Sequence, residues 1–411
     1  MKIRLWLVLM TGLAIAPQIL AQSDEDTDLE DLGYFADAKN TLKFGFRLVT
    51  GPKVHFGNLG TVPYLNTVAL PSAGEIDRLY NDGRVIKDSP RTDPIHSEVN
   101  STGQQTSTPG GRYIVTDTNG ATQGDYISYT PGVTRQWSYI NASQAVALGE
   151  GTGIAMSSYS ATSDGAGFDA KKKYSDGIEL QVERSVGKLG KRWDVNIVAG
   201  LAISTITGNQ SGNVQSTLNT IRDVYSLNGQ TAPTAPYTGP TFGPLTLPDT
   251  TVLPSGFENT PPLTSVPASH TETSAPGAAT VSGVWKISGA YYIMRLGPEL
   301  RARLTKDIGI STSAGFSAAY AGTTYSAVES FSITGIADPI STPTESSVAG
   351  KYFSGFYANM DAEWQLNDRT GIYAGFSYES IGAYDQSVGG RTAKIDLSGT
   401  VGVRGGLSIK F

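Results

Sequence analysis

Apolar and polar residues alternate along the last 17 residues of the chain. From Ile395 to Phe411 every second residue is apolar or glycine, and most of the residues between them are polar. Successive side chains of a β-strand point to opposite faces, so this stretch has one apolar and one polar face. An ordinary strand has about 5 or 6 residues, whereas a tilted strand of roughly 9 to 11 residues crosses a bilayer. The pattern therefore predicts a membrane-spanning strand with its apolar face toward lipid.

The same alternation returns in seven earlier stretches of the chain. Tight connections near residues 188–191, 305–307 and 367–370 join six of these stretches in three pairs, and long connections separate the pairs. Short periplasmic turns that alternate with long extracellular loops are typical of outer-membrane barrels. We therefore predict an all-β fold, an antiparallel up-and-down transmembrane barrel of eight strands, or of ten if the first loop adds a spanning hairpin. The predicted extracellular loops are residues 51–173, 207–283, 323–349 and 383–392.

The start of the chain has the features of a secretory signal peptide. A basic beginning precedes an apolar run over residues 5–16, and Ala21 supplies a small residue before a cleavage point. The apolar run is shorter than the ~20 residues that a spanning helix needs. We predict a removed signal peptide over residues 1–21, an acidic periplasmic tail over residues 22–40 and the barrel over residues 41–411.

Composition agrees with a barrel and argues against a nucleic-acid-binding protein. The chain has 48 Gly and 20 Tyr, and only 39% of its residues are hydrophobic. A barrel in lipid needs fewer apolar residues than a globular core because its interior is polar. The chain has no cysteine, which excludes disulfide bonds as a source of stability. A net charge of −6, without a basic stripe that carries interleaved aromatic residues, argues against a nucleic-acid partner.

Charged residues on the polar faces of the predicted strands are nearly balanced in sign. The interior of an eight-stranded barrel is only just wide enough for side chains to fill it. Because buried charges are tolerated when they are paired, we predict an ion-paired network that seals the barrel. A porin-like channel for small solutes is the alternative. The predicted network is Lys43, Arg47, Glu179, Glu183, Arg295, Glu299, Arg301, Asp361, Glu363, Asp396 and Arg404, and further inward charges include Lys351, Glu379, Lys394 and Lys410.

Histidine is the usual general base of hydrolytic enzymes, so its positions bear on catalysis. The three histidines, His55, His96 and His270, all fall in predicted loops, and none lies beside a recognisable nucleophile motif. We therefore expect no enzymatic activity, no cofactor and no metal. An outer-membrane hydrolase or acyltransferase is a further alternative, and it requires His55 or His96 to approach a Ser, Asp or Glu at the barrel rim.

The second predicted loop has two parts of different composition. Residues 212–227 contain four apolar residues that would share one face of a helix, which predicts a short amphipathic helix that caps the barrel mouth. These are Val214, Leu218, Ile221 and Tyr225. The stretch that follows holds 10 of the 21 prolines and predicts an extended surface segment. The first loop has enough apolar residues to fold in part, as an extra hairpin or a lid.

The terminal sequence GLSIKF ends the last alternating strand on an aromatic residue. This ending resembles the C-terminal signature of outer-membrane β-barrels, and the whole pattern resembles the small OmpA-like barrels of diderm bacteria, with unusually long extracellular loops. The resemblance implies an outer-membrane location, contact with outer-membrane lipid and recognition by the barrel assembly machinery. The residues that would carry this recognition by strand addition are Gly405, Leu407, Ile409 and Phe411. With a sealed interior, the large loops favour a structural role or binding of an unknown surface ligand.

Overall fold

The computed structural model describes residues 39–65, 71–88, 97–99, 105–107, 115–116, 122–123, 131–170, 174–190, 192–239 and 260–411. The predicted signal peptide, nearly all of the predicted acidic tail, and His96 lie outside these residues. Within the described part of the chain, no helix has the length and apolar character needed to cross a membrane.

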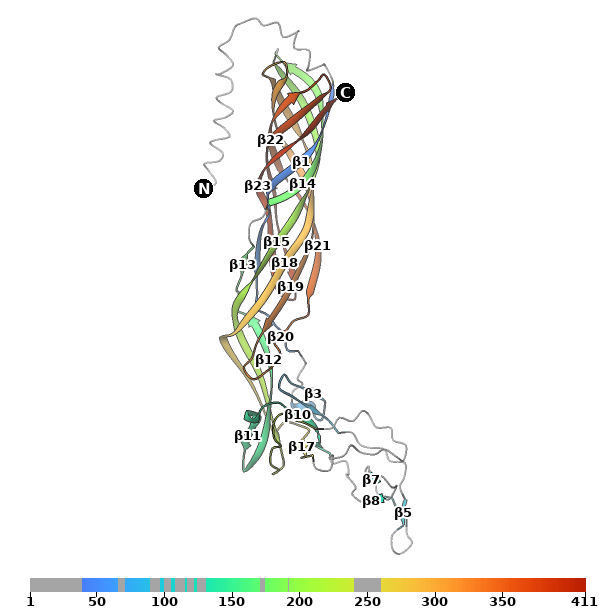
Figure 1. The fold of residues 1–411 in the computed structure, drawn as a ribbon, viewed down its shortest axis with the longest axis vertical. Coiled ribbons are helices and arrows are strands. Elements are labelled where there is room, and N and C mark those ends of the chain that lie inside the picture. The colour runs from blue at the N-terminus through green and yellow to red at the C-terminus, as the bar shows by residue number, and fades with distance from the viewer. Residues whose placement is uncertain are drawn as a thin grey trace.

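Eight antiparallel strands close into a barrel, and this confirms the predicted fold class. Their order around the ring is β1-β14-β15-β18-β19-β21-β22-β23, and the ring closes by pairing of β23 with β1. Figure 1 shows them as a long barrel with the C-terminus at one end. The strands are β1 (Asn40–Thr50), β14 (Tyr174–Leu189), β15 (Trp193–Ser226), β18 (Ser269–Arg303), β19 (Ile308–Phe331), β21 (Glu345–Gln365), β22 (Thr370–Val388) and β23 (Arg391–Lys410).

The outward face of the barrel is apolar over the part nearest the C-terminus. Phe46 and Phe316, for example, are 69% and 83% exposed. An outward apolar band of this kind is the lipid-facing surface of an outer-membrane barrel, so this part of the protein spans the membrane. We call the band the belt. It consists of Phe44, Phe46, Leu48, Ile178, Leu180, Val182, Ile197, Leu201, Met294, Leu296, Phe316, Phe356, Met360, Ile372, Phe376, Val401, Val403, Leu407 and Ile409.

Exposed aromatic residues mark both edges of the belt. Trp364 and Phe411 lie at the edge near the C-terminus, and four tyrosines lie at the other edge. Aromatic side chains gather at both membrane–water interfaces because their rings combine apolar area with a polar tip. The short turns of the barrel lie at the edge near the C-terminus and the long connections lie beyond the distal edge, so the distal edge is the outer interface. Its tyrosines are Tyr174, Tyr292, Tyr320 and Tyr352.

Beyond the tyrosines the strands continue into a second part, which we call the stalk. β15 and β18 contain 34 and 35 residues, far more than a bilayer crossing needs, and they stay paired almost to their distal ends. β1 and β14 take no part in the stalk, where β2 (Lys53–Gly57) pairs with β23 and β12 (Gly151–Ser163) pairs with β15. A bridge between Val62 and Ala161 joins the two segments and completes the wall. The stalk comprises residues 53–62, 151–169, 206–226, 269–289, 323–345 and 381–397.

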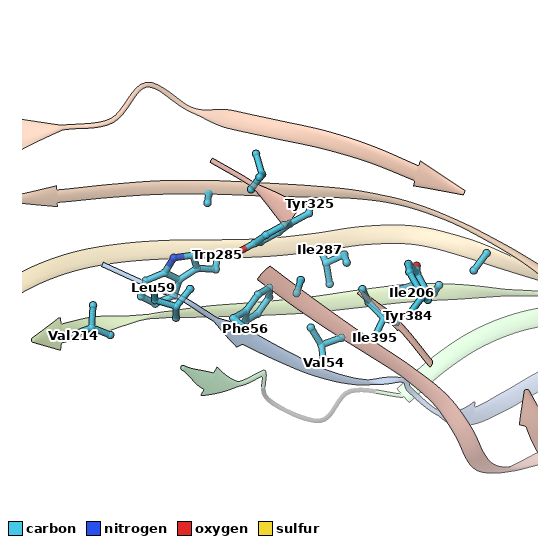
Figure 2. Close-up of a cluster of buried hydrophobic side chains, with 14 of the residues drawn as sticks. Val54, Phe56, Leu59, Ile206, Val214, Trp285, Ile287, Tyr325, Tyr384 and Ile395 are labelled. Carbon is cyan, nitrogen blue, oxygen red and sulfur yellow. The ribbon is translucent and has the colours of Figure 1, made fainter. Parts of the chain in front are cut away.

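The stalk reverses the polarity of the membrane-spanning part. Its interior is an apolar core in which Phe56, Trp285 and Tyr325 are completely buried (Figure 2). The rings of Phe56 and Tyr325 stack with their centres 5.6 Å apart. Farther along β18, within the membrane-spanning part, the buried side chains include the charged Arg295, Glu299 and Arg301. The core therefore fills the barrel above the membrane. Its apolar groups lie inside and its polar groups outside, which is the arrangement of a soluble protein.

The prediction of an amphipathic helix over residues 212–227 is wrong. This segment continues β15, which pairs with β12 on one side and with β18 on the other. Val214 and Leu218 pack in the stalk core, whereas Tyr225 belongs to a different core. Pairing on both sides satisfies the backbone and fixes a strand, and this tertiary effect outweighs a weak helical pattern.

The other predicted loops also contain strand. The first loop supplies β2 and β12, the second loop supplies the distal parts of β15 and β18, and β19 and β22 run on to Phe331 and Val388. The connections between the strands are therefore shorter than the sequence indicated, and much of the predicted loop sequence builds the stalk.

The apolar face predicted for the last strand is divided between two surfaces, the stalk core and the belt. Ile395 and Leu397 are fully buried in the stalk core, whereas Leu407 is half exposed on the belt. A bulge lies between them at Gly399, whose φ is +70°. One extra residue reverses the face to which the odd-numbered side chains point.

A folded head lies at the end of the stalk that is distant from the belt (Figure 1). Trp137 is completely buried in its core and packs against Tyr139 and Tyr237. The head comprises residues 71–88, 131–150, 227–239 and 260–268. Its main sheet has the order β16 (Tyr237–Thr238), β10 (Gln136–Tyr139), β4 (Gly83–Ile86) and β3 (Arg78–Leu79).

Candidate functional site

The interior of the membrane-spanning part holds a network of buried ion pairs. Arg47 donates two hydrogen bonds to Glu379, of 2.8 and 2.7 Å. Lys43 Nζ lies 2.6 Å from a carboxylate oxygen of Glu183, and all four side chains are at most 1% exposed. These pairs join β1 to β14 and, across the interior, to β22. Charges from opposite walls of the barrel therefore meet at its centre.

Arg404 lies near the middle of this network. Its Nε donates to Asp361 Oδ1 over 2.8 Å, and its Nη1 contacts both Glu179 and Gln181. Glu179 also accepts a hydrogen bond of 2.8 Å from Arg295 and one of 3.0 Å from Tyr373. The carboxylates on β14 and β21 are thus bridged by cations on β18 and β23.

A third group of charges lies closer to the C-terminal end of the barrel. Arg301 Nη2 donates to Glu183 and lies 3.3 Å from Glu363 Oε2. Glu363 accepts a 2.7 Å hydrogen bond from Ser408, and Glu299 accepts one of 2.9 Å from Asn196. Ten of the eleven residues predicted for the network thus lie together in the interior, with Glu379 as a further member.

Asp396, the eleventh predicted residue, lies outside the network. It is half-buried in the stalk, where it accepts hydrogen bonds from the backbone and the hydroxyl group of Ser398. Lys394 is exposed on the outer face. The bulge at Gly399 explains both corrections, because it turns the even-numbered residues outward above the membrane. Lys351 is also exposed, since β21 pairs with β22 only from Phe356 toward the C-terminus.

The stalk contains a buried carboxylate that the sequence analysis missed. Glu329 is fully buried and accepts hydrogen bonds from the backbone N–H groups of Gly60 and Thr61, at 2.9 and 2.8 Å. Trp285 Nε1 donates to the same carboxylate over 2.8 Å, and Arg391 Nε lies 2.8 Å from it. This arrangement holds the segment after β2 against β18, β19 and β23, so its role is structural.

A polar cluster joins the stalk to the head. Asp223 of β15 is fully buried, and its Oδ1 lies 2.6 Å from Nδ1 of His270 on the neighbouring β18. Its Oδ2 accepts a 2.5 Å hydrogen bond from Tyr80, whose hydroxyl group also lies 2.6 Å from that of Tyr225. The other ring nitrogen of His270 lies 3.1 Å from the exposed Glu272. A carboxylate therefore faces each ring nitrogen.

Two groups near this junction have shifted pKa values. Burial alone lowers the pKa of His270, but the hydrogen bonds to Asp223 and Glu272 outweigh it and raise the pKa above its ordinary value of 6.5. Burial raises the pKa of the Asp82 carboxyl group to about 6, although the backbone N–H group of Ser157 donates to it. In both cases the folded protein binds a proton more tightly at the head or at its junction with the stalk than the unfolded chain does.

We expect the head and its junction with the stalk to lose stability as the pH rises. The contribution of Asp82 is present below pH 3.8, the ordinary pKa, and is lost as the pH approaches about 6. The contribution of His270 is present below pH 6.5 and is lost as the pH rises through its raised pKa. Limited proteolysis of wild type and His270→Gln at each pH measures the effect, because the ratio of the two rates cancels the pH dependence of the protease. The ratio should approach one at high pH, and a constant ratio would contradict the prediction.

His55 meets the geometric condition set for a catalytic histidine, since its Nδ1 lies 2.8 Å from Asp169 Oδ1. The two side chains are 55% and 87% exposed on the outside of the stalk. A catalytic base works in a site that positions a substrate, and this pair lies on an open surface. His96 falls outside the described residues. Among the described residues, no group of three or more His, Asp or Glu side chains is arranged to hold a metal ion.

Strand register explains why the sequence analysis missed the polar cluster between the stalk and the head. Asp223 and His270 lie 47 residues apart and meet only because β15 and β18 pair far above the membrane. Asp223 and Tyr225 are alternate residues of a strand, so their side chains point to the same face. This spacing was a possible sign of the cluster, but the helical interpretation of the segment concealed it.

No protein-family model and no curated protein matches the sequence. Among solved structures, the chain is similar to Ail, the attachment invasion locus protein of Yersinia pestis, with 11% identity over 62% of this chain and 94% of Ail and a TM-score of 0.21. It is also similar to the outer membrane protease OmpT from Escherichia coli, with 8% identity over 91% of this chain and 98% of that one and a TM-score of 0.26. The strand pairing of the chain itself defines the fold.

Proposed function

We propose that this protein is a non-enzymatic outer-membrane barrel that holds a head away from the membrane for binding at the cell surface. The observation that carries the proposal is the stalk, whose apolar core continues the barrel wall and ends in a second core. The buried side chains of Trp285 and Glu329 and the paired strands around them are features of a rigid structure and not of a flexible loop. The chain therefore uses much of its length to place one domain at a distance.

The length of the stalk supports this role. β15 continues for about 20 residues beyond the outer interface, from Ile206 to Ser226. At about 3.3 Å per residue and the usual barrel tilt, this raises the head by roughly 50 Å. A rise of this size places the head beyond the lipid headgroups, where a macromolecule or another cell can reach it.

An epitope placed in the head should be accessible on intact cells. The turn at Glu150, between β11 (Ala145–Leu148) and β12, is exposed and suits an inserted tag. A tag in the turn at Asp368, at the opposite end of the barrel, should bind antibody only after the outer membrane is permeabilised. Flow cytometry of both tagged proteins measures this. Labelling of the Asp368 tag on intact cells would contradict the proposed orientation.

A porin-like channel is the alternative function, and the packing of the interior opposes it. Charged side chains that are at most 8% exposed cross the membrane-spanning part, and aromatic side chains fill the stalk above them. We expect purified protein in planar bilayers to give no steady single-channel openings. Steady openings would reject the sealed interior and favour the channel.

A further inference from the structure

We propose that β18 binds the same strand of a second copy of this protein, so that copies anchored in two opposed membranes pair edge to edge. The site is the edge of β18 from Ser269 to Ala275, where the stalk meets the head. The inference rests on the proposed function and names the partner of surface binding as another copy of the chain.

The distal end of the stalk is a sheet of three strands, β12, β15 and β18. Its β12 edge is covered, because the N–H group of Asn81 donates to the carbonyl oxygen of Ser157 over 3.0 Å and Asn81 Oδ1 accepts a 2.8 Å hydrogen bond from the N–H group of Tyr159. β18 pairs with β19 only from Ser282 toward the C-terminus, and no other described strand pairs with this edge of β18 before that residue. The backbone groups of residues 269–275 that point away from β15 therefore face outward, ready to pair with a further strand.

The composition of this edge favours strand pairing. The residues from Thr271 to Ala275 are all exposed, so small side chains lie on both faces of the strand. Edge strands are usually protected by lysine, proline or a bulge. Pro276 and the bulge at Gly277, whose φ is +68°, lie directly after the segment, and the segment itself contains no Lys, Arg or Pro. The segment has the length of an ordinary strand and is suited to strand addition.

Membrane anchoring fixes how a second copy can approach. Two identical strand edges pair symmetrically about a twofold axis perpendicular to the sheet, so the two strands run antiparallel. The membrane-spanning parts of the two copies then lie at opposite ends of the pair, and each belt requires its own membrane. Thr271 lies opposite Arg222, 16 residues beyond Ile206 at the outer interface. At about 3.3 Å per residue and the usual barrel tilt, the two membranes would be roughly 80 Å apart.

Charge complementarity selects the register of the pair. Opposite residues of an antiparallel pair share a face, so the twofold axis must pass through one residue. With the axis at Thr271, His270 of each copy lies opposite Glu272 of the other. An axis at Glu272 would instead place two carboxylates opposite each other, and one at Thr273 would place His270 opposite Pro276. Opposite charges stabilise a strand pair and like charges destabilise it, so the axis at Thr271 is favoured.

His270 carries the positive charge that this register requires. Its two ring nitrogens lie 2.6 Å from Asp223 Oδ1 and 3.1 Å from Glu272 Oε1, and both carboxylates favour the protonated ring. In the pair, each histidine would lie between the Glu272 side chains of the two copies, on the face that also carries Asp223. Charges of opposite sign therefore alternate across the contact.

Vesicles that carry the full chain test the pairing. Two populations with different fluorophores are mixed, and two-colour coincidence counts the vesicles that are joined. Wild-type vesicles should associate with one another but not with protein-free vesicles. Thr271→Lys places two like charges opposite each other and should lower association about fivefold or more, because the effect is multiplied over many copies. Thr280→Lys makes the same change at an exposed residue of β18 outside the segment and should leave association unchanged.

A cysteine at the twofold axis gives a second test, since the chain has no cysteine of its own. Opposite residues of an antiparallel pair have Cα atoms about 4.5–5.5 Å apart, which is within the range of a disulfide bond. When one vesicle population carries a size-tagged chain, Thr271→Cys should give a disulfide-linked dimer of tagged and untagged chains after mild oxidation. Ala275→Cys lies on the same face of the strand, but its two copies would be about 26 Å apart and should give no dimer.

Three results would overturn the inference: no dimer between the two populations, association with protein-free vesicles, or association that survives Thr271→Lys. Heat-modifiable migration and limited proteolysis confirm that each variant is folded. The tag at Glu150 separates this failure from that of the proposed function. A tag that antibody reaches on intact cells, with no association of wild-type vesicles, refutes only the second copy as partner, whereas a tag that antibody does not reach refutes both.

Discussion

Replacing Arg47 by Met is expected to lower the free energy of unfolding by about 3–5 kcal/mol, because it leaves the buried carboxylate of Glu379 without its two strongest hydrogen bonds. The remaining cation, Arg295, has its Nη1 3.8 Å away and cannot replace them. Urea unfolding of the protein in lipid vesicles, followed by tryptophan fluorescence and by heat-modifiable gel migration, measures the change.

The double variant Arg47→Met with Glu379→Leu should be less destabilised than Arg47→Met alone. Removing both charges leaves neither one buried without a partner, and apolar groups of similar volume fill the space. Lys306→Met, in an exposed turn at the periplasmic end, is the control and should change stability by less than about 0.5 kcal/mol. A double variant as unstable as the sum of the two single variants would show that the pair does not act as an isolated unit.

The period-two pattern was enough to predict the ring of eight strands and the face on which the charges lie. It failed in the stalk because the inward positions there include small residues that hide the alternation. Gly208 faces the core, and a Cβ atom at this position would lie 3.1 Å from side-chain atoms of Ile287 and Val54. The space is taken by a segment of the first loop, and no local pattern in β15 indicates that segment.

The bulge at Gly399 was a second feature that the sequence pattern could not predict. In the sequence, Gly399 occupies one more position of an alternating apolar face, so nothing indicates that the face changes sides there. The register shift is visible only in the pairing of β22 with β23. Lys394 and Asp396 were therefore assigned to the interior, whereas Arg404, on the other side of the bulge, was placed correctly.

The second large effect is expected from a substitution in the stalk core. Trp285→Ala should cost about 3–5 kcal/mol of stalk stability, because it leaves a cavity in the core and removes a hydrogen bond to the buried Glu329. The belt and the ion-pair network do not contact this side chain, so heat-modifiable migration of the membrane-spanning part should persist. Limited proteolysis of the folded protein in vesicles should show faster cleavage between β2 and the head.

Trp364→Ala is the matched control for this change, because the same side chain is removed from the other end of the molecule. Trp364 is 55% exposed at the edge of the belt, where lipid and water fill the space that the ring leaves. It should therefore affect stalk proteolysis little. Equal resistance of the stalk to proteolysis in Trp285→Ala and Trp364→Ala would show that the apolar core does not keep the stalk rigid. The strand pairing alone would then hold the head away from the membrane.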